Sequence, residues 1–235
     1  MYSKLSNVYL CLYFKQVMSY KAILVGASGL IGSELLKQVS EDRDFGEIVL
    51  ITRRPLTFYS NKVRQIVTDF DHLDKISAEI SGDVIYSCLG STRKKTPDAA
   101  EYRKIEYDYT LNIARMGLSN GVKQLHYISS LGADISSSTS YLRLKGEVER
   151  ALMDLPYPAL HIYQPSYLKG DRAEKRSDDK LMKPIMSVLD PLLVGKLSKY
   201  KSIAAESVAK AMIKQTLTNN KGVFIHPSNI IKELA

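Results

Sequence analysis

One stretch near the start of the chain combines an apolar run with three closely spaced glycines. Between Lys21 and Gly32 the sequence reads KAILVGASGLIG. Because glycine permits tight turns and close backbone approach, this spacing predicts a buried strand that turns directly into a helix. The first N–H groups of such a helix attract phosphate, so the pattern favours a bound dinucleotide, with an ordinary strand-to-helix turn as the alternative. The candidate contacts are Gly26, Ser28, Gly29, Leu30, Ile31 and Gly32.

Short apolar runs then alternate with helical segments along the chain. Further strands are predicted at 47–51, 63–67, 83–88, 125–129 and 159–163, and helices at 30–39, 73–80, 99–119 and 141–153. This rhythm predicts an α/β fold, a doubly wound parallel Rossmann sheet with helices on both faces. We expect one domain over 18–235, whose segment from about 165, with a helix at 204–217 and a strand at 223–226, covers the open end of the site.

Composition restricts the setting and the partners. Cys11 and Cys88 lie far apart, and neither they nor the four histidines show metal-ligand spacing, which argues against a disulfide scaffold or a metal site and favours a cytoplasmic protein. The net charge of +8 comes from 33 basic residues dispersed among 25 acidic ones, which favours an anionic small molecule over nucleic acid. The apolar run 8–14 is too short to span a bilayer. We expect residues 1–17 to be an extension outside the chemistry, the alternative being an ordered element on the sheet.

Residues that follow three of the predicted strands are candidates for further dinucleotide contacts. Arg53 and Arg54 stand where an acidic residue would bind the ribose of NAD, and arginine there fits a 2′-phosphate, so NADP(H) is favoured over NAD(H). Two further pairs follow the third and fourth strands. Asp69 and Phe70 could flank the adenine, although Asp69 could equally cap a helix, and Leu89 and Gly90 would leave room for a ribose or form a simple strand-end turn.

A tyrosine and a lysine four residues apart form a second signal. At this spacing Tyr141 and Lys145 share one face of a helix, and a neighbouring ammonium lowers the pKa of a tyrosine. Such a tyrosine can deliver or remove a proton. The spacing also arises by chance in a chain with 15 tyrosines, but here Ser129 and Ser130 precede it at the end of the fifth strand. The glycine turn and this pair therefore indicate one cleft.

With these motifs the chain resembles an atypical short-chain dehydrogenase/reductase. The branch is that of the NAD(P)H-binding proteins similar to the vertebrate HIV Tat-interacting oxidoreductase and its bacterial relatives. The resemblance runs from about Lys21 to Arg172 and is carried by GASGLIG, LITRRPLTF, VTDF, YSCLGSTR, YISSLGADISSSTSYLRLKGEVE and YQPSYLKGDR.

The resemblance implies roles for particular residues. Ser130 would orient the substrate carbonyl, with Ser129 as the alternative, Tyr141 would be the general acid/base and Lys145 would hold the nicotinamide ribose. Leu168 would contact the cofactor, as would Arg53, Arg54, Leu89 and Gly90. Two departures concern the substrate side and the proton relay. Gln164 and Ser166 replace the arginine and glycine of an Arg-Pro-Gly turn, and Glu106 and Asp108 lie near the place of a helix asparagine.

These observations favour an NADPH-dependent reductase that acts on a small carbonyl substrate. The alternative from another class is an NADP(H)-sensing regulatory or protein-interaction module without significant turnover. A nucleotide-sugar epimerase shares the motifs, but about seventy residues after Pro165 are few for its substrate lobe. A homodimer is compatible with the four-helix contacts common in such families, and no nucleic acid or membrane partner is expected.

Overall fold

Seven parallel strands form the central sheet of this computed structural model, which describes residues 19–170 and 189–235. In order across the sheet the strands are β3 (Val63–Val67), β2 (Phe45–Thr52), β1 (Tyr20–Val25), β4 (Val84–Ser87), β5 (Gln124–Ile128), β6 (Ala159–Gln164) and β9 (Gly222–Pro227). Every neighbouring pair is parallel. The expected doubly wound sheet is confirmed. The order reverses between β1 and β4, and in such sheets ligands bind beyond the carboxyl ends of the strands at this point.

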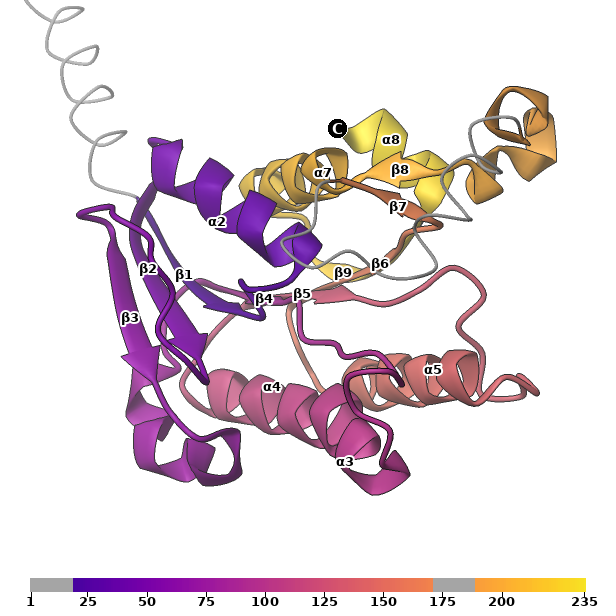
Figure 1. The fold of residues 1–235 in the computed structure, drawn as a ribbon. Helices are drawn as coiled ribbons and strands as arrows, with labels where there is room; N and C mark the ends of the chain where they lie inside the picture. The colour runs from indigo at the N-terminus through magenta and orange to yellow at the C-terminus, as the bar shows by residue number, and fades with distance from the viewer. Residues whose placement is uncertain (1–18, 171–188) are drawn as a thin grey trace, which may run out of the picture.

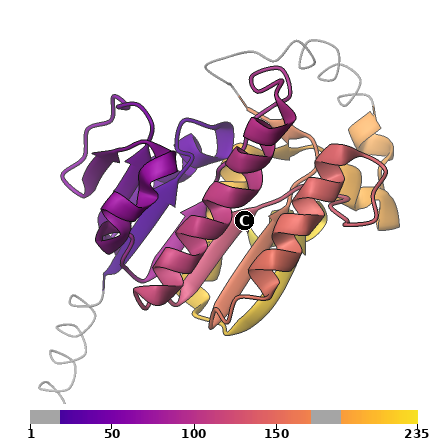
Figure 2. The ribbon, with the colours of Figure 1, turned by 90° about the horizontal axis from the view of Figure 1, so that it is seen from below.

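Helices cover both faces of the sheet (Figures 1 and 2). One face carries α2 (Leu30–Glu41), α7 (Ala205–Thr218) and α8 (Ser228–Leu234). The other carries η1 (Phe70–Glu79), α3 (Ala99–Arg103), η2 (Lys104–Asp108), α4 (Tyr109–Ser119) and α5 (Ser140–Met153). Residues 22–25 of β1 are fully buried because apolar side chains leave the strand toward both helical layers. The apolar runs of the sequence therefore predict the strands well.

Two predicted helices differ in detail from the observed ones. The segment expected as a helix at 73–80 is a 3-10 helix over Phe70–Glu79, interrupted by non-helical dihedrals at His72 and Ile76. The helix expected at 99–119 is divided by the π-helical segment η2. Apolar periodicity cannot separate these helix types, because each repeats its side chains every three to five residues.

The chain beyond β6 forms a small second sheet at the carboxyl end of the main one (Figure 1). It pairs β7 (Leu168–Lys169) with β8 (Ile203–Ala204), and η3 (Asp190–Leu192) and η4 (Gly195–Tyr200) precede β8. The expectations for residues 1–17 and for the charged loop 171–180 lie outside the described residues.

A row of stacked histidines crosses three strands beneath α7. The rings of His126 and His161 lie 4.6 Å apart between centroids, and Nδ1 of His161 lies 3.0 Å from Nε2 of His226. Burial lowers the pKa of His161 and of His226 to about 4, and each nearby imidazolium would repel another. The row is therefore neutral at neutral pH. Within the described ranges no cluster of His, Cys, Asp and Glu could hold a metal ion.

Candidate active site

The glycine turn fits tightly between β1, β4 and α2. Gly26 has φ of +83°, and a Cβ added there would lie within 3.0 Å of the Cys88 carbonyl and of the Leu89 nitrogen. A Cβ on Gly32 would collide with the Gly26 carbonyl in the same way. Any larger side chain at these two positions would therefore displace the end of β4 or the start of α2.

The N-terminus of α2 is left free for an anion. Gly29 is the N-cap residue and offers no side-chain cap, and the first turn contains no acidic residue. In a helix the first N–H groups, here those of Leu30, Ile31 and Gly32, lack intrahelical partners and carry partial positive charge. Ser28 and Gly29 are exposed beside them. This open cradle of glycine backbone fits a pyrophosphate.

The segment that contains Leu168 lies beside this turn. A Cβ on Gly170, two residues further along, would lie 2.8 Å from Cδ1 of Leu30. Leu168 itself pairs with Ile203 in the small sheet and packs against the core on the α2 side.

The residues expected around the adenosine end of the cofactor lie in different surroundings. Arg53 and Arg54 follow β2, are exposed and form no ion pair with another described residue. Asp69 caps η1, because its carboxylate accepts the Asp71 N–H at 3.1 Å. Phe70 is 4 % exposed, and its ring packs 5.4 Å from the Tyr109 ring in the core. The Phe70 ring is therefore packed inside the protein in this structure rather than exposed where it could stack on an adenine.

A buried ion pair connects η2 with α5 at the candidate site. Nζ of Lys145 lies 2.8 Å from Oε2 of Glu106, with side-chain exposures of only 6 % and 2 %. Nζ also donates to the Tyr127 hydroxyl and to the Ile128 carbonyl, each at 3.1 Å. Burial by itself would lower the pKa of Lys145, but the Glu106 carboxylate outweighs it and holds that pKa well above the ordinary value. The Lys145 side chain is therefore a charged ammonium that is held beside the carboxyl end of β5.

Glu106 also contacts the loop after β4. Its Oε1 accepts the Ser91 N–H at 2.7 Å, and a Cβ on Gly90 would lie 3.4 Å from the same oxygen. Leu89, on the other side of Gly90, is half-buried against the core. The carboxylate thus connects the predicted cofactor residues Leu89 and Gly90 to Lys145.

Sequence reasoning noted Glu106 near the missing asparagine but gave it no role. Glu106 lies on the π-helical segment η2, which packs against α5. The sequence contains a signal for a buried Glu106, since Tyr102, Glu106, Tyr109 and Ile113 follow at helical spacing. In the structure all four are buried. A carboxylate on such an apolar face requires a buried partner.

Tyr141 and Lys145 lie on successive turns of α5 but in different surroundings. Tyr141 stands in the first turn and is exposed, while Lys145 is buried one turn later. The Tyr141 hydroxyl makes no hydrogen bond within the described part of the chain. Gly146 holds α5 close to the preceding loop, because a Cβ there would lie within 3.0 Å of the Asp134 backbone.

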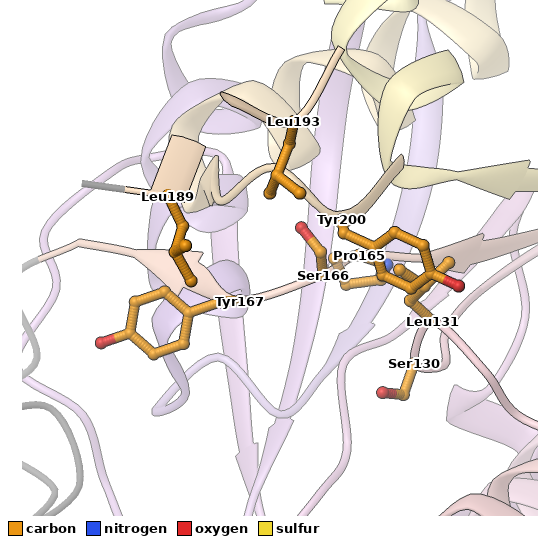
Figure 3. Close-up of a pocket in the computed structure, with 8 residues that line it drawn as sticks. All are labelled: Ser130, Leu131, Pro165, Ser166, Tyr167, Leu189, Leu193 and Tyr200. Atoms are coloured by element: carbon orange, nitrogen blue, oxygen red, sulfur yellow. The ribbon is translucent and has the colours of Figure 1, made fainter. Parts of the chain in front are cut away.

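The two candidate serines have different partners. Ser129 is buried, and its hydroxyl donates to the Glu149 carboxylate. Gln164 donates to both oxygens of the same carboxylate, at 2.9 and 3.1 Å. Burial nevertheless raises the pKa of Glu149. Ser130 points into a cavity instead, and its hydroxyl bonds to no other side chain that the structure describes (Figure 3). This geometry favours Ser130 over Ser129 as the residue that meets a substrate.

The cavity beside Ser130 has a volume of about 510 Å³ (Figure 3). Leu131 and residues 165–167, which follow β5 and β6, line it. Leu189, Leu193 and Tyr200, from the segment before β8, complete the lining. Ser166, one of the two departures from the family turn, directs its hydroxyl away to the Lys201 carbonyl.

The sequence of the chain matches a known family over most of its length. The model of the NAD dependent epimerase/dehydratase family matches residues 22–225. The chain belongs to this family. Protein HTATIP2 of Rattus norvegicus is 36% identical over 178 residues, which cover 74% of this chain and 73% of that protein. The mitochondrial protein FMP52 of Candida albicans is 33% identical over 156 residues, or 64% and 68% of the two chains. The family gives the chain an NAD(P)-binding role of the oxidoreductase type.

Solved structures share the fold. MoeE5 in complex with UDP-glucose and NAD superposes with a TM-score of 0.66 at 15% identity, covering 87% of this chain and 74% of that one. The PhqB reductase domain of Penicillium fellutanum gives a TM-score of 0.61 at 18% identity, with coverages of 94% and 72%. These similarities establish the Rossmann-type architecture of the chain.

The names of the relatives correct the expectation of a cytoplasmic location. Several of them, including those of Candida albicans and Coccidioides immitis, are named mitochondrial proteins. The cytoplasmic location inferred from two cysteines is therefore wrong, because a low cysteine content does not distinguish between compartments. None of the described helices is long and apolar enough to cross a membrane.

Proposed function

We propose that the protein is an NADPH-dependent reductase that acts on a carbonyl substrate. The observation that carries this proposal is the buried Lys145 ammonium, held by Glu106 and the Ile128 carbonyl at the end of β5. Both Ser130 and Tyr141 precede it in the sequence: Ser130 lies two residues after Ile128, and Tyr141 lies four residues before Lys145 on the same helix. A protein that only senses a dinucleotide needs no such fixed charge.

The residues present fit the cofactor. The turn from Gly26 to Gly32 would hold the pyrophosphate, and Arg53 and Arg54 are free of described carboxylates and would hold a 2′-phosphate. Bound NADPH would supply a hydride to the carbonyl carbon and leave as NADP⁺, and the aldehyde or ketone would become an alcohol.

The chain's own groups would handle the oxygen and the proton. The Ser130 hydroxyl would donate a hydrogen bond to the carbonyl oxygen and orient it. The Tyr141 hydroxyl would give that oxygen a proton as negative charge develops there. The fixed ammonium of Lys145 would then favour the tyrosinate that remains, because opposite charges stabilise the ionised form.

Replacement of one phenol tests the reaction. Tyr141→Phe should lower reduction of a carbonyl panel, followed by NADPH absorbance, by about 10²-fold or more, since general acid catalysis contributes that much. Its Kd for NADPH should stay unchanged, and Tyr59→Phe, at an exposed site, is the matched control. Full turnover by Tyr141→Phe would refute the assignment. Tight NADPH binding by the wild type with no turnover of any carbonyl would instead support the sensing function.

Loss of an arginine tests the cofactor preference. Arg53→Ala or Arg54→Ala should raise the Kd for NADPH about tenfold or more and leave that for NADH unchanged, because a charge-assisted hydrogen bond to the 2′-phosphate is lost. Arg43→Ala removes an equal charge from another exposed site and is the control. Equal effects of all three variants on NADPH would contradict the preference, since only a general charge effect would then be present.

A further inference from the structure

The walls of the cavity beside Ser130 are apolar. Leu131, Leu189 and Leu193 line it together with the rings of Tyr167 and Tyr200 (Figure 3). No charged side chain is among its described lining residues. The volume of about 510 Å³ lies within the range of about 300 to 1,000 Å³ that is usual for small-molecule sites. The cavity therefore suits a compact organic molecule with an apolar body.

Only one of the two serine hydroxyls in the cavity is left for a ligand. The Ser166 hydroxyl donates to the Lys201 carbonyl and lies 2.9 Å from the Ser228 hydroxyl. The Ser130 hydroxyl has no such partner among the described residues. Walls made mainly of leucine side chains and tyrosine rings, with the Ser130 hydroxyl among them, suit a molecule that has few polar groups.

Three charged side chains near the lining residues, those of Lys169, Asp190 and Lys199, contact other groups of the protein. Nζ of Lys169 pairs with Asp190 at 2.6 Å, and Asp190 also accepts the Ser202 N–H at 2.8 Å. Nζ of Lys199 lies 5.2 Å from the centroid of the Tyr200 ring, over its face. A ligand with two phosphates would require cations that the described walls do not offer.

We infer that this cavity is the substrate site and that the substrate is an uncharged carbonyl compound with an apolar, aromatic or branched body. This inference rests on the proposed reductase function, since it assigns Ser130 to the carbonyl oxygen. It separates the chain from its structural neighbour MoeE5, which binds UDP-glucose. The large exposed fractions of Leu189 and Tyr200, 42% and 47%, fit the same conclusion, because an apolar body would cover them.

A matched pair of ketones tests the substrate class. In 4-methylacetophenone and 4-acetylbenzoate the carbonyl and ring are the same, and a methyl group is exchanged for a carboxylate. With the full-length protein and NADPH, kcat/KM should be at least about tenfold higher for the methyl compound, and UDP-glucose should neither react nor compete. Higher kcat/KM for 4-acetylbenzoate, or competition by UDP-glucose, would overturn the inference while leaving the reductase function intact.

A second measurement separates the cavity from the chemistry. Binding of 4-methylacetophenone to the NADP⁺ complex, measured by calorimetry, should weaken about tenfold or more in Leu193→Asp, which places a charge in the wall. Leu192→Asp introduces the same charge one residue away, at a position 69% exposed and outside the cavity, and should bind normally. Binding that depends on Leu193 without turnover would support the site and refute the reductase. No binding by the wild type, or equal effects of the two variants, would overturn the inference.

Discussion

Removal of the Glu106 charge should destabilise the fold far more than removal of a surface carboxylate. Glu106→Gln keeps the side-chain size and an oxygen for the Ser91 N–H, but it leaves the buried Lys145 ammonium without a counter-charge. The Nζ to Oε2 distance of 2.8 Å and exposures of 6% and 2% place this pair deep inside the protein. Breaking a buried pair from one side costs about 3 to 5 kcal/mol, and we expect this loss in the free energy of unfolding.

Urea denaturation of three variants measures the loss. Glu147→Gln breaks the ion pair with Arg103, whose side chains are 48% and 33% exposed, and should cost at most about 1 kcal/mol. The double variant with Glu106→Gln and Lys145→Met should recover much of the stability, because removing both buried charges is often neutral. A loss in Glu106→Gln no greater than that in Glu147→Gln would refute the reasoning, since the Lys145 ammonium would then be solvated.

The pH dependence of this effect has a definite sign. The folded-state pKa of Lys145 is raised, because the Glu106 carboxylate outweighs the burial that opposes it. Stability from the pair is therefore fully present below the ordinary lysine pKa and is lost as the pH rises through the raised value. The wild type and Glu106→Gln should differ most at neutral pH and converge only in strong alkali.

Three further variants test other parts of the structure. Gly26→Ala should abolish NADPH binding in titrations and lower the thermal midpoint far more than Gly121→Ala, which has the same φ of +83° but nothing within 4 Å of its added Cβ; equal losses would show that only φ matters. Stability of the wild type should fall as the pH drops from 6.5 toward about 4, since the unfolded chain protonates histidines whose folded pKa is lowered, by up to about 1.4 kcal/mol per pH unit for each histidine. His161→Phe should reduce this slope in urea titrations, and an unchanged slope would assign it to other groups. Glu149→Gln should keep or raise the urea midpoint at pH 7, because the raised pKa of that carboxyl means its charged form costs stability above the ordinary value of 4.5; a lower midpoint would mean that the bonds from Ser129 and Gln164 outweigh the burial.

The fold could be predicted from the sequence because its strands are continuous apolar runs. A strand buried on both faces needs no particular neighbour to be recognised, and β6, predicted at 159–163, spans Ala159–Gln164 with every residue but the last buried. The small sheet of β7 and β8 was missed, since each strand has only two residues and no periodicity. The helix α8 was missed for a similar reason, as its seven residues give little pattern.

The candidate site was less predictable because its contacts depend on side-chain direction. Successive residues beyond a strand point to opposite sides, so a shift of one residue decides whether Ser129 or Ser130 meets the cavity. Side-chain direction also decides the place of Phe70, whose position after β3 suggested adenine but which begins η1 with its ring in the core. The partner of Lys145 is 39 positions away from it on another helix, which no local spacing records.

One carboxylate therefore connects parts of the site that the sequence presents separately. Oε1 of Glu106 fixes the loop after β4 through the Ser91 N–H, and Oε2 fixes the ammonium of α5. If that loop moves when the cofactor binds, the position of the Lys145 ammonium would therefore change with it, because both bonds depend on the Glu106 side chain. Glu106→Gln retains the first bond and removes the second charge, so a variant that still binds NADPH but loses turnover would localise the coupling to the ion pair. Loss of NADPH binding as well would show that the ion pair also supports the cofactor site, since the bond to the loop is retained.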